Sequence, residues 1–274
     1  VQIEKNWQVI FEDKTTSLEL KADHSALIMK QIWDFSQTVD IDDVKEILDR
    51  QITCNMAIAN EGIHNSYGAN IGHVILNMDS DCVKTRAKAY AAAGSDARMN
   101  GCELPVVINS GSGNQGITCC VPVVVYAKEL DCTQEQLYRA LVLSNLTAIY
   151  IKTGIGTLSA FCGAVSAGAA AGAGIAYLHN GTYKEIQHTI VNALAILSGT
   201  ICDGAKASCA AKIASSIDAG IMGYYMYKNK QQFYAGDGII AHSVDETIQN
   251  IGTLGSQGML QTNDKIIEMM ISCD

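Results

Sequence analysis

The pattern of hydrophobic and polar positions changes along the chain. Near the N-terminus, residues 7–11 and 17–22 show the short apolar runs and alternation that are typical of strands. The apolar run over residues 26–32 is expected to join them as a third strand. Farther along, apolar residues recur at helical spacing. We therefore expect a strand-rich front over residues 1–40 and a mostly helical part over residues 41–274.

Helix-start signals precede several of the periodic segments. A Ser, Thr or Asp followed three residues later by Glu or Gln predicts a capping box. The pairs are Asp43 with Glu46, Thr133 with Gln136, Thr182 with Glu185, and Ser243 with Glu246. A further helix is expected over residues 83–93, ended by a turn at residues 94–96. Together these patterns predict an α+β fold in one continuous domain of residues 1–274, chiefly a helical bundle with a small strand-containing N-terminal region.

One long stretch, between Thr153 and Tyr183, contains no charged residue. About 20 apolar residues can span a bilayer, but this stretch is made mainly of Gly, Ala and Ser and lacks the bulky side chains that drive insertion. It predicts a small-residue helix buried in the bundle rather than a membrane span.

Composition excludes several classes of protein. Hydrophobic residues make up 48% of the chain and charged residues 17%, which is typical of a globular protein and not of a disordered one. The formal charge of −9 has the wrong sign for a general nucleic-acid binder. Ten cysteines without a secretory leader point to the reducing cytoplasm, where cysteines serve as packing, metal ligands or nucleophiles.

The first candidate for chemistry is the string Asn109-Ser110-Gly111-Ser112-Gly113-Asn114-Gln115-Gly116. It matches GxGxxG formally, but Pro122 disfavours a regular helix after it and no suitable acidic residue follows, so a dinucleotide site is not supported. Glycines and small polar side chains can form a backbone nest that binds a carboxylate. A plain polar turn between two apolar segments remains an equal alternative.

The second candidate is a set of three cysteines. Cys202 and Cys209 are seven residues apart in a turn between two predicted helices, and Cys162 lies in another segment of small residues. Three thiolates could hold a 4Fe-4S cluster and leave one iron open to a substrate. Because the spacing contains no C-x-x-C, three core cysteines are the default alternative.

Ionisable residues form the third group. The six histidines show no metal-ligand spacing, and His64 in Glu61-Gly62-Ile63-His64-Asn65 is the most site-like of them. Lys206 follows Cys202 and Asp203 in the same turn. A lysine near a glycine-rich anion loop is also what a pyridoxal phosphate enzyme would show, so this alternative stays open.

The Asn109–Gly116 string, Cys162-Gly163-Ala164 and Cys202-Asp203-Gly204-Ala205-Lys206 followed by Cys209 together resemble the iron–sulfur-dependent L-serine dehydratase α-domain, and most closely its L-cysteine desulfidase branch. The likeness runs from about Gly101 to the C-terminus. It implies β-elimination from a small α-amino acid, giving pyruvate and ammonia, with sulfide released when the substrate is cysteine.

Carried onto this sequence, the resemblance implies that Cys162, Cys202 and Cys209 hold the cluster. It implies that the substrate is bound by Asn109, Ser110, Gly111, Ser112, Gly113 and Asn114. His64, Lys206 and Asp203 are the ionisable candidates for acid–base catalysis. Members of the family also carry an N-terminal Gly-Cys-Thr-Glu-Pro motif, which this sequence lacks.

The leading hypothesis is therefore a cytoplasmic lyase domain acting on L-cysteine or L-serine, expected to be incomplete and to need a missing N-terminal segment or a second chain, with a homo-oligomer possible. No nucleic acid or membrane partner is expected. Two other functions stay open at this point. One is a pyridoxal phosphate lyase that uses Lys206, and the other is a non-catalytic cysteine-rich structural or binding domain.

Overall fold

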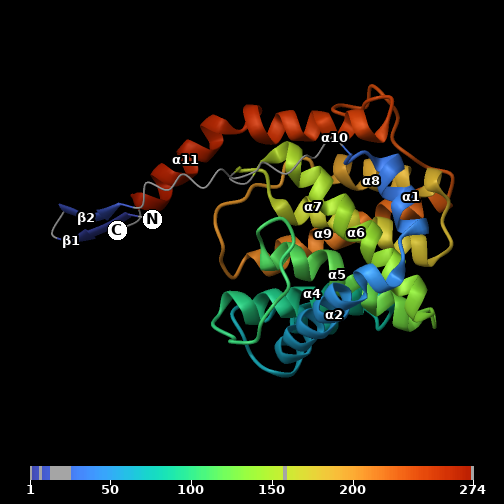
Figure 1. The fold of residues 1–274 in the computed structure, drawn as a ribbon, viewed down its shortest axis with the longest axis horizontal. Coiled ribbons are helices and arrows are strands. Elements are labelled where there is room, and N and C mark those ends of the chain that lie inside the picture. The colour runs from blue at the N-terminus through green and yellow to red at the C-terminus, as the bar shows by residue number, and fades with distance from the viewer. Residues whose placement is uncertain (1, 6–7, 13–25, 157–158, 273–274) are drawn as a thin grey trace.

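The computed structural model describes residues 2–5, 8–12, 26–156 and 159–272. Apart from one hairpin, the regular elements of this part of the chain are helices (Figure 1). They are α1 (Met29–Thr38), α2 (Ile41–His64), α3 (Ile71–Met78), α4 (Val83–Met99), α5 (Gly113–Glu129), α6 (Gln134–Ile155), α7 (Gly163–Leu178), α8 (Tyr183–Ile196), α9 (Cys209–Lys228), α10 (Val244–Thr253), the π-helical turn η1 (Leu254–Gly258) and α11 (Leu260–Ile271).

The predicted α+β fold class is wrong, because the described body of the protein is helical. The strands β1 (Gln2–Lys5) and β2 (Gln8–Glu12) form an antiparallel hairpin that stands away from the helices in Figure 1 and adds no layer to them. The predicted strand at 7–11 overlaps β2, and the one at 17–22 lies outside the described residues.

The expected third strand over residues 26–32 is also wrong, because α1 begins within it. Met29, Ile32 and Ser36 are the buried residues of α1, and their spacing places them on one helical face. The backbone N–H of Met29 donates to the Asp245 carboxylate at 2.9 Å, which supplies an acceptor for the start of the helix. A short apolar run cannot distinguish a strand from a buried helix face, and here tertiary contacts decide.

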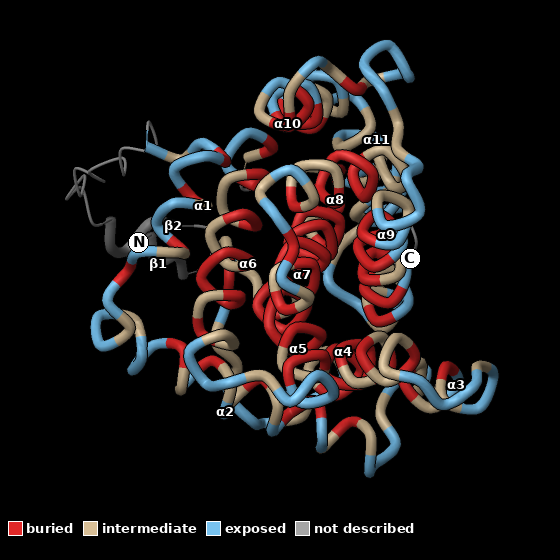
Figure 2. Tube along the Cα trace, turned by 90° about the vertical axis from the view of Figure 1, so that its right-hand side faces the viewer, coloured by how far each residue is buried: buried red, intermediate tan, exposed pale blue. Residues whose placement is uncertain are grey.

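Helix α7 lies at the centre of the bundle, as Figure 2 shows by its almost continuous buried trace between α6 and α9. Its glycines allow close contact with α9, since a Cβ on Gly168 would lie 2.4 Å from the Ser216 carbonyl oxygen. Gly172 approaches Gly220 in the same way. The part of the uncharged stretch that forms α7 is thus a packed small-residue helix, and none of the helices described here is long and apolar enough to cross a membrane.

Local signals placed some helix ends correctly and others not. The three capping boxes at Thr133, Thr182 and Ser243 are all formed. The capping box predicted at Asp43 is wrong, because Asp40 caps α2 by accepting a hydrogen bond from the Asp42 N–H. The capping signal is local, so it fails only where a neighbouring residue offers a better cap.

Two predicted helix breaks are absent. Helix α4 continues through residues 94–96 to Met99, and Gly94 packs against Ala59 of α2 instead of forming a turn. Helix α5 contains Pro122 in its buried interior. The proline removes one helical hydrogen bond, but α5 is packed against α4, α6 and α7, and burial of its apolar surface stabilises the helix in spite of that loss.

Candidate functional site

A short backbone pairing brings together two segments that are about forty residues apart in sequence. The Cys162 N–H donates to the Thr200 carbonyl oxygen at 3.1 Å, and the Cys202 N–H donates to the Ala160 carbonyl oxygen at 2.6 Å. Phe161 and Ile201 form the antiparallel bridge between them. Because side chains alternate across a strand, Cys162 and Cys202 lie on the same face of this pairing.

The two thiols form a hydrogen-bonded pair with opposite pKa shifts. The hydrogen bond with Cys162 lowers the pKa of Cys202 well below its ordinary value, assisted by the Gly204 backbone N–H and by Lys212 and Lys152. The same hydrogen bond, together with burial, raises the pKa of Cys162. Of the two thiols, Cys202 therefore takes negative charge more readily than Cys162.

Two charged side chains lie in the turn after Cys202, and Lys212 of α9 joins them. Asp203 forms ion pairs with both Lys206 and Lys212, and these two ammonium groups lower the pKa of its carboxyl to about 2. Lys212 also donates to the Ile201 carbonyl oxygen at 2.9 Å, which ties α9 to the paired segment. Asp203 and Lys206, both predicted as acid–base candidates, are thus paired with each other.

Lys152 is a residue of this site that the sequence analysis missed. It lies in the last turn of α6, it is only 8% exposed, and burial lowers its pKa. The neighbouring Cys202 and Cys162 oppose this lowering of its pKa. A lysine in the last turn of a helix is a common surface feature, so nothing in the local sequence distinguishes this one.

Cys209 is less closely joined to the pair than Cys162 and Cys202 are to each other. It begins α9, its sulfur accepts a hydrogen bond from the Lys206 N–H at 3.4 Å, and it donates to the Gly204 carbonyl oxygen at 3.6 Å. Within the described ranges, no three His, Cys, Asp or Glu side chains are gathered as a metal site. The sulfurs of Cys162 and Cys202 are suitable donors for two ligand positions of an iron–sulfur cluster. In the described structure, Cys209 does not lie close enough to join them as a third ligand.

The Asn109–Gly116 string folds into a tight hairpin that leads directly into a helix. Asn109 and Ser112 exchange both backbone hydrogen bonds, at 3.1 and 3.0 Å, while Ser110 and Gly111 between them have positive φ angles of 49° and 78°. Ser112 then caps α5 by accepting a hydrogen bond from the Gln115 N–H. The expectation that no helix opens here is wrong, because α5 begins at Gly113.

Gln115 connects this string to the cysteine pair. Its side chain lies against Gly163, where a Cβ would be 2.6 Å from the Gln115 Cδ. Gly163 follows Cys162 and begins α7. Among the described residues, the buried Gln115 Oε1 atom has no hydrogen-bond partner, and neither has the hydroxyl of Ser166 in the first turn of α7. The first turns of α5 and α7 therefore meet beside Cys162 with unused hydrogen-bonding capacity.

His64 takes no part in this arrangement within the described structure. It ends α2, its side chain is exposed, and its Nδ1 atom lies 2.7 Å from the Asn60 carbonyl oxygen of its own helix. This hydrogen bond to the preceding turn is typical of a histidine at a helix C-terminus.

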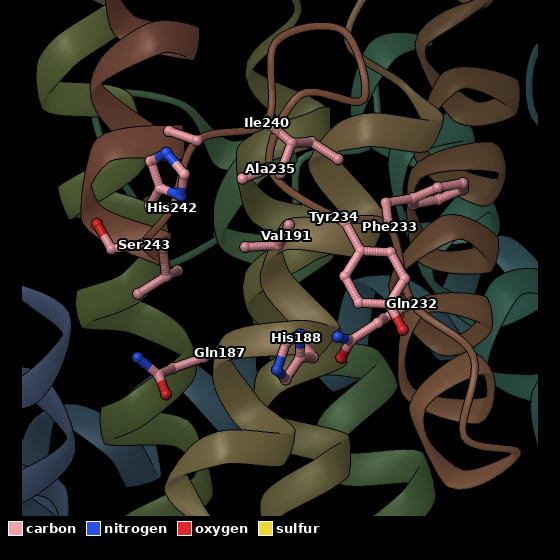
Figure 3. Close-up of a pocket in the computed structure, with 12 residues that line it drawn as sticks. Gln187, His188, Val191, Gln232, Phe233, Tyr234, Ala235, Ile240, His242 and Ser243 are labelled. Atoms are coloured by element: carbon pink, nitrogen blue, oxygen red, sulfur yellow. The ribbon is translucent and has the colours of Figure 1, made fainter.

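Two surface cavities lie apart from the cysteine pair. One, of about 280 Å³, lies beside Asn109 and Ser110 and is otherwise lined mainly by apolar side chains of α1, α2 and α6. The other, of about 340 Å³, lies between α8, the loop before α10 and the start of α10 (Figure 3). In Figure 3, the rings of His188 and His242 flank this second cavity from different elements. No predicted site residue lines the second cavity, whereas Asn109 and Ser110 border the first.

Comparisons with known proteins agree with the resemblance carried by these strings. A UPF0597 protein of Desulfitobacterium hafniense is 57% identical over 274 residues, which cover 99% of this chain and 64% of that protein. UPF0597 proteins of Lachnoclostridium phytofermentans and Finegoldia magna are 51% and 49% identical over 272 residues, each covering 99% of this chain and 65% of the relative. The chain thus spans less than two thirds of the length of these relatives. No solved structure matches it.

A family model described as the serine dehydratase alpha chain matches residues 6–268. This range includes the Asn109–Gly116 string, the paired cysteines and the turn that carries Asp203 and Lys206. The chain belongs to the serine dehydratase alpha chain family.

Proposed function

We propose that this chain is a lyase domain that catalyses β-elimination from L-cysteine or L-serine with the help of a 4Fe-4S cluster. The observation that carries the proposal is the pairing of residues 160–162 with 200–202, which places Cys162 and Cys202 on one face. Family membership supports the reaction class. The proposed ligands are Cys162, Cys202 and Cys209, of which Cys209 must move closer to the pair to bind.

The cluster, when bound, supplies a Lewis-acidic iron for the β-thiol or β-hydroxyl of the substrate. The chain's own groups would bind the rest of the molecule. Because Asn109 and Ser112 use their backbone N–H groups on each other, we assign carboxylate binding to the first-turn N–H groups of Gly113 and Asn114 and to the positive-φ turn before them. The nearby buried carboxamide of Gln115 can accept a hydrogen bond from the substrate amine.

Removal of the α-proton needs a base, and the predicted candidates are poorly suited to that role. Asp203, with a pKa of about 2, is a very weak base, and Lys206 is held in an ion pair with it. We therefore propose that a polypeptide outside these residues supplies the base. The relatives have further polypeptide of their own, since the match covers only 64–65% of their length.

Anaerobic reconstitution with iron and sulfide tests the cluster. The native chain should take up iron and acid-labile sulfide, Cys162→Ser and Cys202→Ser should lose most of both, and Cys82→Ser, which removes an exposed cysteine, should behave as the native chain. Equal iron in all four proteins would contradict the ligand assignment. Borohydride reduction tests the pyridoxal phosphate alternative, which requires a covalent adduct on Lys206.

Activity measurements test the need for further polypeptide. The reconstituted chain alone should have at most weak lyase activity, and addition in trans of the remaining third of a relative should raise the rate of pyruvate formation. An isolated chain that turns over L-cysteine or L-serine at about 10 per second, an ordinary enzyme rate, would show that the base lies within these 274 residues.

A further inference from the structure

The side chain of Arg98 connects the end of α4 to the start of α5. Arg98 lies in the last turn of α4, and its Nη1 atom donates to the Asn114 Oδ1 atom, in the first turn of α5, at 3.3 Å. The guanidinium lies against Gly113, since a Cβ built there would be 2.3 Å from the Arg98 Nε and 2.9 Å from its Cζ. The glycine at position 113 therefore leaves the space that this side chain occupies.

Two positively charged features meet at this point. An arginine guanidinium stays ionised in proteins, and the first N–H groups of a helix carry partial positive charge because they have no intrahelical acceptor. Among the described residues, Arg98 forms no ion pair with a carboxylate, and the N–H groups of Gly113 and Asn114 have no acceptor. An anion bound here would interact favourably with both features.

The unused edge of the guanidinium has the geometry that a carboxylate requires. Nη1 bonds to Asn114 and makes a longer contact with the Met99 sulfur at 3.8 Å, whereas Nε and Nη2 have no partner within the described part of the chain. These two nitrogens can donate two parallel hydrogen bonds to the two oxygens of one carboxylate. The free edge of Arg98 therefore favours a carboxylate as the anion.

A second group in the same helical turn points to a ligand that also carries a donor. Gln115 is 6% exposed, and its Oε1 atom is buried with no hydrogen-bond partner among the described residues. A buried acceptor without a donor is unfavourable, and an N–H group of a ligand can supply the missing donor. A carboxylate for Arg98 and an ammonium group for Gln115 are the two charged groups of an α-amino acid.

We propose that Arg98 is a substrate-binding residue that holds the α-carboxylate of the amino acid at the start of α5, together with the N–H groups of Gly113 and Asn114. Arg98 thereby selects amino acids over analogues that lack this negative charge. For the identity of the amino acid, the inference rests on the proposed function. The role of Arg98 concerns binding alone, so it depends neither on the cluster nor on the catalytic base.

Three variants separate charge from shape at Arg98. Arg98→Gln removes the charge and keeps a polar side chain of good helix propensity. Arg98→Met takes its place if the glutamine variant does not fold, and Arg98→Lys keeps the charge without the paired donors. Arg50→Gln is the matched control, because Arg50 is an exposed arginine of α2. Circular dichroism establishes that each variant retains the native helix content.

Equilibrium dialysis under anaerobic, reducing conditions measures binding by the reconstituted chain. The ligands are L-serine and L-cysteine, each compared with its α-carboxamide, which keeps the amine but lacks the carboxylate. The native chain and Arg50→Gln should bind the preferred amino acid at least about tenfold more tightly than its amide. Arg98→Gln should bind this amino acid about tenfold more weakly, equivalent to about 1.4 kcal/mol, and the amide with native affinity. Arg98→Lys should keep part of the selectivity.

The ratio of the two affinities decides the role of Arg98. Native selectivity in Arg98→Gln, either with native affinities or with both ligands weakened equally, overturns the inference, because a purely structural role does not distinguish a carboxylate from its amide. A native chain that binds neither amino acid overturns it as well. If Arg98→Gln binds amino acids as the native chain does but no longer responds to the added third of a relative, Arg98 contacts that polypeptide instead and the inference is wrong.

The same assay distinguishes this inference from the proposed function. If the native chain takes up no iron, the cluster-assisted reaction fails, while dialysis of the metal-free chain still decides the role of Arg98. If the native chain takes up iron and Arg98→Gln keeps its selectivity, the inference about Arg98 fails and the cluster stands.

Discussion

Two polar, glycine-containing strings that look alike in sequence are used in opposite ways. In the Asn109–Gly116 string, backbone groups of Asn109 and Ser112 bond to each other, and Ser112 caps the helix that follows. In the Cys202–Cys209 turn, charged side chains lie around a thiol whose partner comes from a different part of the chain. The first string uses its hydrogen bonds within itself and at the start of α5. The second places charged side chains beside a thiol that contacts a distant segment.

The comparison shows when a polar segment keeps groups free for chemistry. Small polar residues and glycines satisfy many of their own hydrogen bonds locally, so richness in donors does not by itself leave donors free for a ligand. The cysteine pair exists because the short backbone pairing of residues 160–162 with 200–202 joins distant segments. Changes at the tightly packed end of the Asn109–Gly116 string should therefore affect stability first, and changes in the Cys202–Cys209 turn should cost little stability.

The largest effect is expected at Gly116. A Cβ at this position would lie 2.0 Å from the Val107 carbonyl oxygen, and Val107 is held in place by two hydrogen bonds with Asn55 of α2. Gly116→Ala should lower the free energy of unfolding by about 3 kcal/mol, the upper end of the usual cost of overpacking. Urea denaturation measures it. Gly199→Ala is the control, because no atom of the described residues lies within 4 Å of the added Cβ. Equal stability of the two variants would show that the packing of the Asn109–Gly116 string does not limit the stability of the fold.

A substitution at Ser110 should affect binding rather than stability. Ser110 has a left-handed backbone, which asparagine tolerates, so Ser110→Asn adds bulk beside the cavity without backbone strain. Its unfolding free energy should stay within about 0.5 kcal/mol of native. The KM for the amino acid should rise about tenfold, equivalent to 1.4 kcal/mol. KM is measured on the chain to which the remaining third of a relative has been added. An unchanged KM would show that the Asn109–Gly116 string is only a polar turn.

Gln115 tests whether the two regions form one site. Its unpartnered Oε1 is buried against Gly163, so Gln115→Met removes an unsatisfied acceptor and should leave the stability native or slightly higher. If the carboxamide accepts a hydrogen bond from the substrate amine, KM should rise about fivefold, or about 1 kcal/mol. Asn114→Ala, a change one residue away, helps to separate amine binding from general disturbance of the helix start. A substrate affinity unchanged in Gln115→Met would separate the two regions.

Sequence alone predicted the parts of this structure that depend on neighbouring residues. The three capping boxes formed because their hydrogen bonds span only three residues. The interruption expected at Pro122 did not occur, since the packing of α5 among other helices compensates for a missing hydrogen bond. The front of the bundle was misjudged because the apolar residues of 26–32 fit a strand and a buried helix face equally well.

The site was predictable only in part, for a related physical reason. Motif resemblance pointed to Cys162 and Cys202, but their pairing depends on a tertiary contact that spacing does not encode. Lys152 carries no motif, and its burial depends on the packing of α6 against other helices. His64 looked site-like in sequence, yet it is exposed and bonded to its own helix. A charged residue without a surface role becomes recognisable only once burial is known.

The smallest of the losses predicted here is at Asp203, in the turn after Cys202. Its pKa is lowered to about 2, so its ion pairs contribute stability above the unfolded pKa of about 3.9, and that contribution is lost as the pH falls through about 2. Because the side chain is 36% exposed, solvent screening limits the loss in Asp203→Asn to less than about 1 kcal/mol at pH 7. Urea denaturation at pH 7 and pH 2 measures it, and the difference from native should shrink at the lower pH. Asp34→Asn, which removes an exposed carboxylate paired with Lys30, is the control. A loss of unfolding free energy as large as that of Gly116→Ala would show that this turn, like the Asn109–Gly116 string, is needed for the stability of the fold.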